Sequence, residues 1–467
     1  MLRGPVLICY TRCMCRRPQA RAAGNGRNLV GSRAMTRRPF RALAAVLALS
    51  AMVTVCQAAE PDRYKMTVWK DSLRRGGSYF TMRAIETADL AKPAPTIATM
   101  APTLNYVASV GANTVCFNLH GLAGNGDSLA PECVQALRMV VGQTTWRRMG
   151  LICRVFGPDA PRHFAWRLKA ARAAGAALKD DVRVVYWIEG ERCAELVEAF
   201  KETAPDLVVA ATEGGDVRVV REVPKTALDV PALLVGAMPE SPKTSSIHFV
   251  LPDARESYEA IDHAMAHPVE LEPWTPDNSV LSVEERDAGW VALFDGKTLD
   301  GWWIAGMNQK GFAAEEGQIR WKGGGGSAIM TRNRYGNFIL RLEWKLETTG
   351  ANSGIFLRAP RDNRQSKIGM EFQLYGDSGK PPHKNGTGAI YDVVAPLENA
   401  SKPEGEWNEL EITLDGPTMK AVLNGVVIQD RNFDDTEELK YRLRTGFIGL
   451  QDHGHPASWR NIRIKEL

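Results

Sequence analysis

The sequence predicts a multidomain protein, with an α/β domain over residues 60–270 and an all-β sandwich over residues 287–467. In the first region, short apolar runs alternate with amphipathic stretches, which is typical of parallel strands joined by crossover helices. In the second region, short alternating strands follow one another between glycine-rich turns, which is typical of a two-sheet sandwich or jelly roll. Residues 271–286 are rich in proline and polar residues and show no periodicity, so they are the predicted linker.

Composition and charge exclude several classes of function. The net charge of +4 comes largely from the first 41 residues, which are rich in arginine and lack acidic residues, so the rest of the chain gives no electrostatic argument for nucleic-acid binding. The sequence contains no zinc-finger spacing and no Walker loop. Four of the eight cysteines follow residue 60, without disulfide or metal spacing, and we expect buried free thiols at Cys116, Cys133, Cys153 and Cys193.

The N-terminal segment predicts export. Residues 1–34 show no periodicity and are interpreted as an over-extended start, whereas Met35 begins a basic stretch that leads into an apolar run. Residues 35–59 therefore form a predicted signal peptide, with cleavage near Ala58 or Ala59. The paired arginines after Met35 resemble a twin-arginine signal, so the route (Sec or twin-arginine) stays open. The apolar run is too short to span a membrane, and the predicted location is periplasmic or extracellular.

The α/β domain has a partial barrel pattern. Residues 111–118 resemble the second strand of glycosidase-like (β/α) barrels, whose sites lie at the carboxyl ends of the strands. We count six or seven strands, too few for a full barrel, and therefore expect a partial or degenerate one. The predicted strands are Thr67–Trp69, Asn113–His120, Leu151–Phe156, Val182–Ile188, Leu207–Ala211, Ala232–Val235 and Ile247–Leu251.

Four polar residues follow strands of this domain, namely Asn118, His120, Glu189 and Glu213. Glu189 and Glu213 could act as acid and nucleophile of a glycosidase. The alternative is that both are solvated charges at strand ends. We favour the second interpretation, because the Asn-Glu pair usual in such barrels is absent. A barrel that binds sugar without cleaving it also remains open.

The C-terminal domain offers a polar sheet face. In the segment Thr445–His455, Ile448 and Leu450 point one way, whereas Phe447, Gly449, Gln451 and His453 point the other. Gly449 leaves room for a close approach. A hairpin is predicted at Asn424-Gly425, which is a strong two-residue turn signal.

Two further strands have the same polar character. On Met370–Leu374, Glu371 and Gln373 share a face, and on Ser353–Arg358, Phe356 and Arg358 share a face. We expect all three segments to turn these side chains into one hollow. An aromatic ring, a guanidinium and amides together suit a sugar, because the ring stacks on its apolar side and the others bind its hydroxyls.

A series of motifs in residues 288–467 resembles the 3-keto-disaccharide hydrolase domain family. The motifs are Leu293–Trp302, Asn352–Arg358, Met370–Gln373, Gly388–Asp392, Gly405–Asn408 and Gly449–His455. The resemblance implies a concanavalin-like sandwich and an exported carbohydrate-active enzyme that cleaves 3-keto-glycosides. Its substrate would be an oligosaccharide or other glycoside. The 3-keto group acidifies the C2 proton, so cleavage can proceed by elimination and hydration, or by hydrolysis.

Within this resemblance, the expected catalytic residues are His453 as general base, Glu371 as alternative base or acid, and Arg358 as the clamp on the enolate or a hydroxyl. Phe356 would stack on the sugar. The residues expected to orient or bind substrate are Gln373, Tyr391, Gln451 and Trp302, with Asp392 and His455 in second rank. Because Met370–Leu374 carries one carboxylate, ordinary two-carboxylate hydrolysis is not expected.

Other interpretations of the same residues stay open. His453 could be a surface histidine, Arg358 and Glu371 a structural ion pair, and Trp302 a core residue. The whole sandwich could be a non-catalytic, lectin-like glycan-binding module. No cofactor is expected, and a structural calcium ion is left open.

Overall fold

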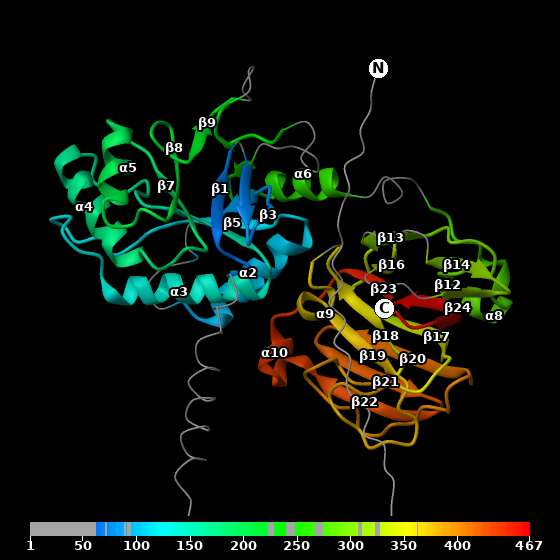
Figure 1. The fold of residues 1–467 in the computed structure, drawn as a ribbon. Coiled ribbons are helices and arrows are strands. Elements are labelled where there is room, and N and C mark those ends of the chain that lie inside the picture. Colours follow the sequence, from blue (N-terminus) through cyan, green and yellow to red (C-terminus); the bar gives the residue numbers. More distant parts are fainter. Residues whose placement is uncertain are drawn as a thin grey trace, which may run out of the picture. The chain divides into compact units, whose positions relative to one another are not determined.

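The computed structural model describes residues 62–70, 72–87, 90, 95–222, 228–239, 248–266, 274–306, 311–322, 327–361 and 363–467. Figure 1 shows a barrel region in blue to green and a β-rich region in yellow-green to red. The predicted over-extended start at residues 1–34 and the predicted signal peptide at residues 35–59 lie outside the described residues. No helix among the described residues is both long enough and apolar enough to cross a bilayer.

Eight strands close into a parallel barrel in the N-terminal part of the chain. They are β4 (Arg83–Glu86), β5 (Thr114–Asn118), β6 (Gly150–Arg154), β7 (Val185–Ile188), β8 (Val208–Ala211), β9 (Val217–Val220), β10 (Ala232–Val235) and β11 (His248–Leu251). The described helices are α2 (Ile97–Ser109), α3 (Pro131–Trp146), α4 (Phe164–Leu178), α5 (Cys193–Lys201) and α6 (Arg255–Met265). No helix lies between β8 and β9, since only five residues connect these two parallel strands.

The expectation of an incomplete barrel is therefore wrong in strand number. The sequence pattern missed β4, because charged residues flank its two apolar residues, and it missed β9, because no helix separates that strand from β8. The predicted first strand instead lies in β1 (Met66–Trp69), which forms a separate antiparallel sheet with β2 (Ser72–Arg75) and β3 (Ser78–Tyr79). Met66 and Leu73 of this sheet pack against the side chains that fill the barrel, such as Ile152 and Val185.

The four cysteines of the barrel region are buried free thiols, which confirms the interpretation from their spacing. Cys116 lies inside the barrel beside Ile152, and burial raises the pKa of its thiol to about 12. A thiol of this kind stays protonated at neutral pH and behaves as a small apolar side chain.

The C-terminal part is a sandwich of two antiparallel sheets, as the pattern predicts. One sheet has the order β14-β15-β24-β17-β20-β21-β22, with β12 paired to β24, and the other has the order β13-β16-β23-β18-β19. The strands are β12 (Val291–Ala292), β13 (Trp302–Gly306), β14 (Phe312–Glu315), β15 (Gln318–Trp321), β16 (Ser327–Thr331), β17 (Phe338–Leu346), β18 (Asn352–Ala359), β19 (Met370–Tyr375), β20 (Asn408–Asp415), β21 (Thr418–Leu423), β22 (Val426–Asn432), β23 (Phe447–Gln451) and β24 (Ala457–Glu466). Short helices are η2 (Phe433–Asp435), α9 (Gln365–Ile368) and α10 (Glu437–Lys440).

Local signals explain two details of this region. Asn424 and Gly425 join β21 to β22 with φ values of 52° and 84°, which confirms the predicted hairpin turn. The predicted linker is more ordered than its composition suggests. It contains η1 (Asn278–Val280) and the start of α8 (Val283–Asp287), and Trp274 packs against the sandwich core.

Candidate active site on the sandwich

The five-stranded sheet has one face in the sandwich core and an outer face, called the open face below, although Phe356, Glu371 and Gln373 on it are themselves largely buried. On β18, Ile355 and Leu357 belong to the core, whereas Asn352, Gly354 and Phe356 alternate with them and lie on the open face. The register pairs Phe356 with Glu371 and Gly354 with Gln373 on β19, and Phe356 with Gly449 on β23. Because paired residues point to the same side of a sheet, these strands contribute to one surface.

Three polar side chains meet on this face, namely Glu371, Gln373 and Gln451. Gly354 lies between them, and its lack of a side chain leaves the space that the Glu371 carboxyl group occupies. A Cβ atom on Gly354 would lie 2.6 Å from Oε1 of Glu371, so the carboxyl group occupies the space that a side chain would take. Sequence reasoning missed this glycine as a site residue, although a glycine within a strand is a signal of close approach.

Glu371 is a buried carboxyl group with only 3% of its surface exposed. Burial raises its pKa from the ordinary 4.5 to about 8, while a hydrogen bond from Gln451 and the charge of Lys367 oppose the rise. Removal of a carboxylate from water penalises its charged form, which explains the direction. Glu371 is therefore predominantly protonated at neutral pH and can donate a proton.

Tyr391 lies beside Glu371 at the edge of the sheet. Its backbone N–H donates to the backbone oxygen of Glu371 at 2.9 Å. Burial, followed by the charges of Glu371 and Asp392, raises the pKa of the Tyr391 hydroxyl. The hydroxyl thus remains a hydrogen-bond donor across the neutral range.

Asp392 is held by two lysines. Its carboxylate accepts from Lys367 Nζ at 2.8 Å and lies 3.1 Å from Lys384 Nζ, and these hydrogen bonds lower its pKa to about 2. Lys367 also lies 5.3 Å from the ring centre of Tyr391. Asp392 therefore fixes Lys367 near Tyr391 and Glu371, and it stays ionised at neutral pH.

Gln373 and His455 are linked through Asn352. Nε2 of Gln373 donates to Oδ1 of Asn352 at 2.8 Å, and the backbone N–H of Asn352 donates to Nδ1 of His455 at 3.3 Å. Oε1 of Gln373 and Oε1 of Gln451 are buried and have no hydrogen-bond partner in the described part of the chain. Two unpaired acceptors beside a carboxyl group suit the hydroxyl donors of a sugar.

Arg358 does not share the face of Phe356, and that expectation is wrong. A bulge between Phe356 and Ala359 and a φ of 48° at Arg358 turn its side chain away. The guanidinium is fully buried and donates to the backbone oxygens of Gly336 and Gly416, each at 2.7 Å. These bonds make Arg358 a structural residue, and it is neither a clamp at the open face nor a partner of Glu371.

Two aromatic residues and a glycine also differ from the expected roles. Trp302 belongs to the sandwich core and donates through Nε1 to the backbone oxygen of Leu293. Phe356 lies on the open face, but it is 6% exposed and packs in a small apolar cluster with Trp303, Met330 and Phe447. The space beside Gly449 is filled by Met330, since a Cβ there would lie 2.3 Å from its sulfur.

His453 lies just outside the sheet. The strand β23 ends at Gln451, whereas the alternation predicted a strand that continued through His453. Gly454 donates its N–H to Oδ1 of Asp452 at 2.7 Å, which closes a turn, and the His453 side chain is exposed. The structure thus places His453 two residues beyond Gln451 and shows no hydrogen bond that would fix its imidazole among the described residues.

The barrel candidates do not form a glutamate pair. Glu189 forms an ion pair with Arg221 at 2.6 Å, and Glu213 is exposed. Asn118 instead accepts from Arg154, which also forms an ion pair with Glu86. Sequence reasoning missed this ion pair, although each of its residues is the charged last residue of a short apolar strand.

No group of three histidine, cysteine, aspartate or glutamate side chains in the described part of the chain is arranged to hold a metal ion. The open face itself offers one carboxyl group and the amides of Gln373 and Gln451, which can form hydrogen bonds with the hydroxyl groups of a sugar.

Residues 289–465 match the model of a family described as a 3-keto-alpha-glucoside-1,2-lyase-like domain. A curated relative, the 3-keto-disaccharide hydrolase of Bacteroides thetaiotaomicron, is 28% identical over 274 residues, which cover 46% of this chain and 90% of the relative. Two solved structures from Parabacteroides distasonis, described as candidate glycosyl hydrolases, are 28% and 26% identical and give TM-scores of 0.36 and 0.34. They cover 40% and 38% of this chain and 98% and 99% of their own chains. The match over residues 289–465 confirms the resemblance seen in the sequence for that part of the chain.

Proposed function

We propose that this protein cleaves the glycosidic bond of a 3-keto-glycoside at the open face of the five-stranded sheet. The observation that carries the proposal is the buried, protonated carboxyl group of Glu371, which lies between hydrogen-bonding amides and a tyrosine. The name of the curated relative supports the substrate class, and the single carboxyl group agrees with a route that does not need two.

The reaction has two steps. A base removes the C2 proton, which the neighbouring 3-keto group makes acidic, and the electron pair forms the C1–C2 double bond as the C1–O bond breaks. Glu371 donates its proton to the departing oxygen, so the aglycone leaves as a neutral alcohol. Water then adds across the double bond, with a proton at C2 and a hydroxyl at C1, and releases the free 3-keto sugar.

The neighbours of Glu371 supply the remaining roles. Tyr391 is a protonated donor for the oxygen at C3, where negative charge develops. The unpaired amide oxygens of Gln373 and Gln451 accept from sugar hydroxyls. His453, exposed two residues beyond the end of β23, stays the proposed base.

The experiment follows a 3-keto-disaccharide in D₂O with the purified mature protein. We expect free sugar to appear, and we expect deuterium at C2 of the released 3-keto sugar, because the elimination removes the original proton. Glu371→Gln should cleave the substrate more slowly by about 10²–10⁴, whereas Glu409→Gln, on the other sheet, should retain full activity. Turnover with hydrogen retained at C2 would replace elimination by direct hydrolysis. Glycan binding without turnover, unchanged in Glu371→Ala and His453→Ala, would instead identify a lectin-like module.

We also propose that the protein is exported, on the strength of the signal-like segment at residues 35–59. Expression from Met35 in a bacterial host should give a periplasmic product whose N-terminal residue lies near position 59. Retention of the full-length chain in the cytoplasm would contradict this proposal.

A further inference from the structure

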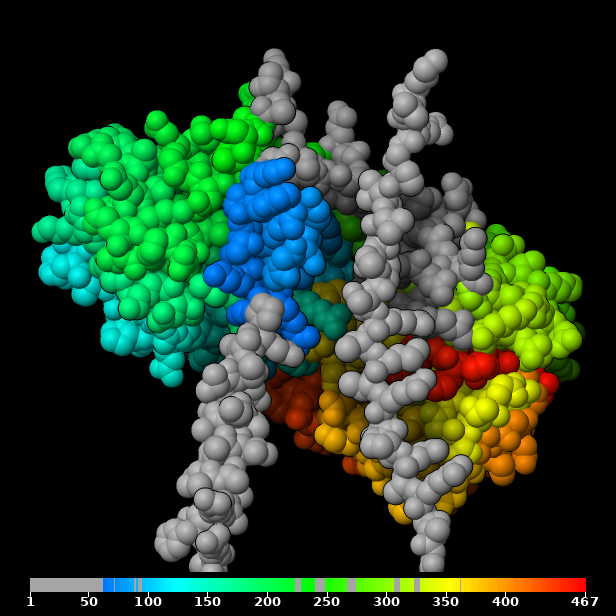
Figure 2. All heavy atoms as spheres, in the orientation of Figure 1, coloured from blue at the N-terminus to red at the C-terminus, as the bar shows by residue number. Residues whose placement is uncertain are grey.

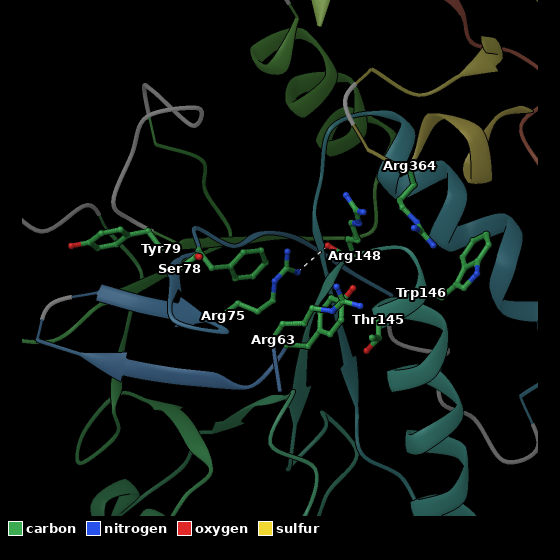
Figure 3. Close-up of a pocket in the computed structure, with 10 residues that line it drawn as sticks. Arg63, Arg75, Ser78, Tyr79, Thr145, Trp146, Arg148 and Arg364 are labelled. Carbon is green, nitrogen blue, oxygen red and sulfur yellow. Dashed lines mark hydrogen bonds between the residues drawn. The ribbon is translucent and has the colours of Figure 1, made fainter. Parts of the chain in front are cut away.

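A pocket of about 570 Å³ is lined mainly by residues of the barrel region. It is lined by Arg63, Tyr64, Arg75, Ser78, Tyr79, Phe80, Thr145, Trp146, Arg148 and Arg364. Figure 3 shows that its walls come from the β1–β3 sheet and from the end of α3. Figure 2 shows that sheet, in blue, at the molecular surface. The volume falls in the range of small-molecule sites.

The pocket is positively charged. Three arginines of the barrel region line it, namely Arg63, Arg75 and Arg148, and no aspartate or glutamate is among its described lining residues. The nearby carboxylate of Asp62 is already bound to Arg183, at 2.8 Å. Like charges gathered in one cavity repel one another, and a bound anion would relieve that repulsion.

Two contacts hold the Arg75 side chain in place at the cavity. Nη1 of Arg75 donates to the backbone oxygen of Arg148 at 2.9 Å, the bond drawn in Figure 3. The guanidinium of Arg75 also lies 4.1 Å from the ring centre of Phe80. Burial, together with the charge of Arg148, lowers the pKa of Arg75. Arg75 is thus pre-positioned, with donor groups left over for a ligand.

The carbonyl end of α3 would by itself disfavour an anion here. Arg147 offsets this effect, because its Nη1 donates to the backbone oxygen of Gln143 at 3.1 Å. The aromatic lining residues Tyr64, Phe80 and Trp146 add apolar surface beside the charges. Charge and ring surface together match a ligand that has an anionic group attached to a ring.

We propose that this pocket binds a small anionic ligand, in which a phosphate, sulfate or carboxylate group is attached to a ring such as that of a sugar. The arginines bind the oxyanion through forked hydrogen bonds, and the aromatic residues contact the ring. This site is separate from the proposed cleavage site and does not depend on it.

The test measures ligand binding to the purified mature protein by calorimetry, at an ionic strength held constant with sodium chloride. The probes are glucose 6-phosphate, glucuronate, inorganic sulfate and, as the neutral counterpart, glucose. We expect the sugar anions to bind more tightly than sulfate, and glucose not to bind in this pocket. A preference between glucose 6-phosphate and glucuronate identifies the anionic group.

Arg63→Gln and Arg148→Gln are the test variants, because both side chains are exposed and their loss should leave the fold intact. Each should weaken binding of the sugar anions by about tenfold. Arg255→Gln is the matched control, since its side chain is 86% exposed on α6 and outside the pocket, and it should bind like the wild type. Absence of binding by every anion, or equal affinity in wild type and both pocket variants, would overturn the proposal.

Discussion

Glu371 is the residue on which the chemistry depends, and its burial has a consequence for stability. Its pKa rises from 4.5 in the unfolded chain to about 8 in the folded protein. Between these values the folded protein keeps a proton that the unfolded chain has released. Stability therefore falls as the pH rises through this window. Urea unfolding at pH 5 and pH 8 should show a larger loss for wild type than for Glu371→Gln, and parallel losses would contradict the buried, protonated state.

Arg358 provides a contrasting residue-scale prediction. Its buried guanidinium holds the backbone oxygens of Gly336 and Gly416, so Arg358→Ala leaves both without a donor. We expect a loss of about 2–4 kcal/mol in the free energy of unfolding. Chemical denaturation measures this loss. If the variant keeps wild-type stability and loses only kcat, Arg358 contacts substrate and its structural assignment is wrong.

At the scale of elements, β18 shapes the site through Gly354. Gly354→Ala would place a Cβ at 2.6 Å from the Glu371 carboxyl group, so that group must move away from Gln451. We expect kcat/KM to fall by about a hundredfold. The limb of the pH–rate profile that reports the ionisation of Glu371 should also shift, because its hydrogen bond from Gln451 changes. Gly142→Ala on α3 is the control, because no other atom lies within 4 Å of the added Cβ, and its kcat/KM should equal that of the wild type. Gly416→Ala would not serve as a control, since the φ of 51° at Gly416 disfavours alanine. Unchanged activity in Gly354→Ala would remove Gly354 from the site.

The strands of the open face also explain how far the sequence could predict the site. Period-two alternation correctly placed Glu371 and Gln373 opposite Phe372, and Gln451 opposite Leu450, because those strands are regular. It failed at Arg358, where a bulge and a positive φ break the alternation, and neither has a clear sequence signal. It failed in the barrel for another reason: β4 has only two apolar residues between charged ones, and β9 follows β8 after five residues without a helix, so neither is recognisable as a separate strand.

At the scale of the whole molecule, the sandwich has its own hydrophobic core, to which Trp274 adds from the predicted linker. A fragment that begins at Trp274 should therefore fold and retain cleavage of a 3-keto-disaccharide. A fragment that begins at residue 290 lacks Trp274, and it also lacks the hydrogen bonds between Ser282 and Glu285 that cap α8. We expect the shorter fragment to unfold at a lower temperature, since it loses the contact of the partly buried Trp274 ring with the sandwich core, which contributes about 1–2 kcal/mol. Thermal unfolding measures the difference, and equal melting temperatures would show that Trp274 is dispensable.

The cleavage rate of a 3-keto-disaccharide, compared at pH 7 between wild type and Glu371→Gln, tests the central claim most directly. The exchange replaces the protonated carboxyl group with an amide of nearly equal size, so packing at the open face is preserved while proton donation is lost. We expect release of free sugar by the wild type and a rate lower by about 10²–10⁴ in the variant. Equal rates in the two proteins would contradict it, because the proton would then come from a group other than Glu371.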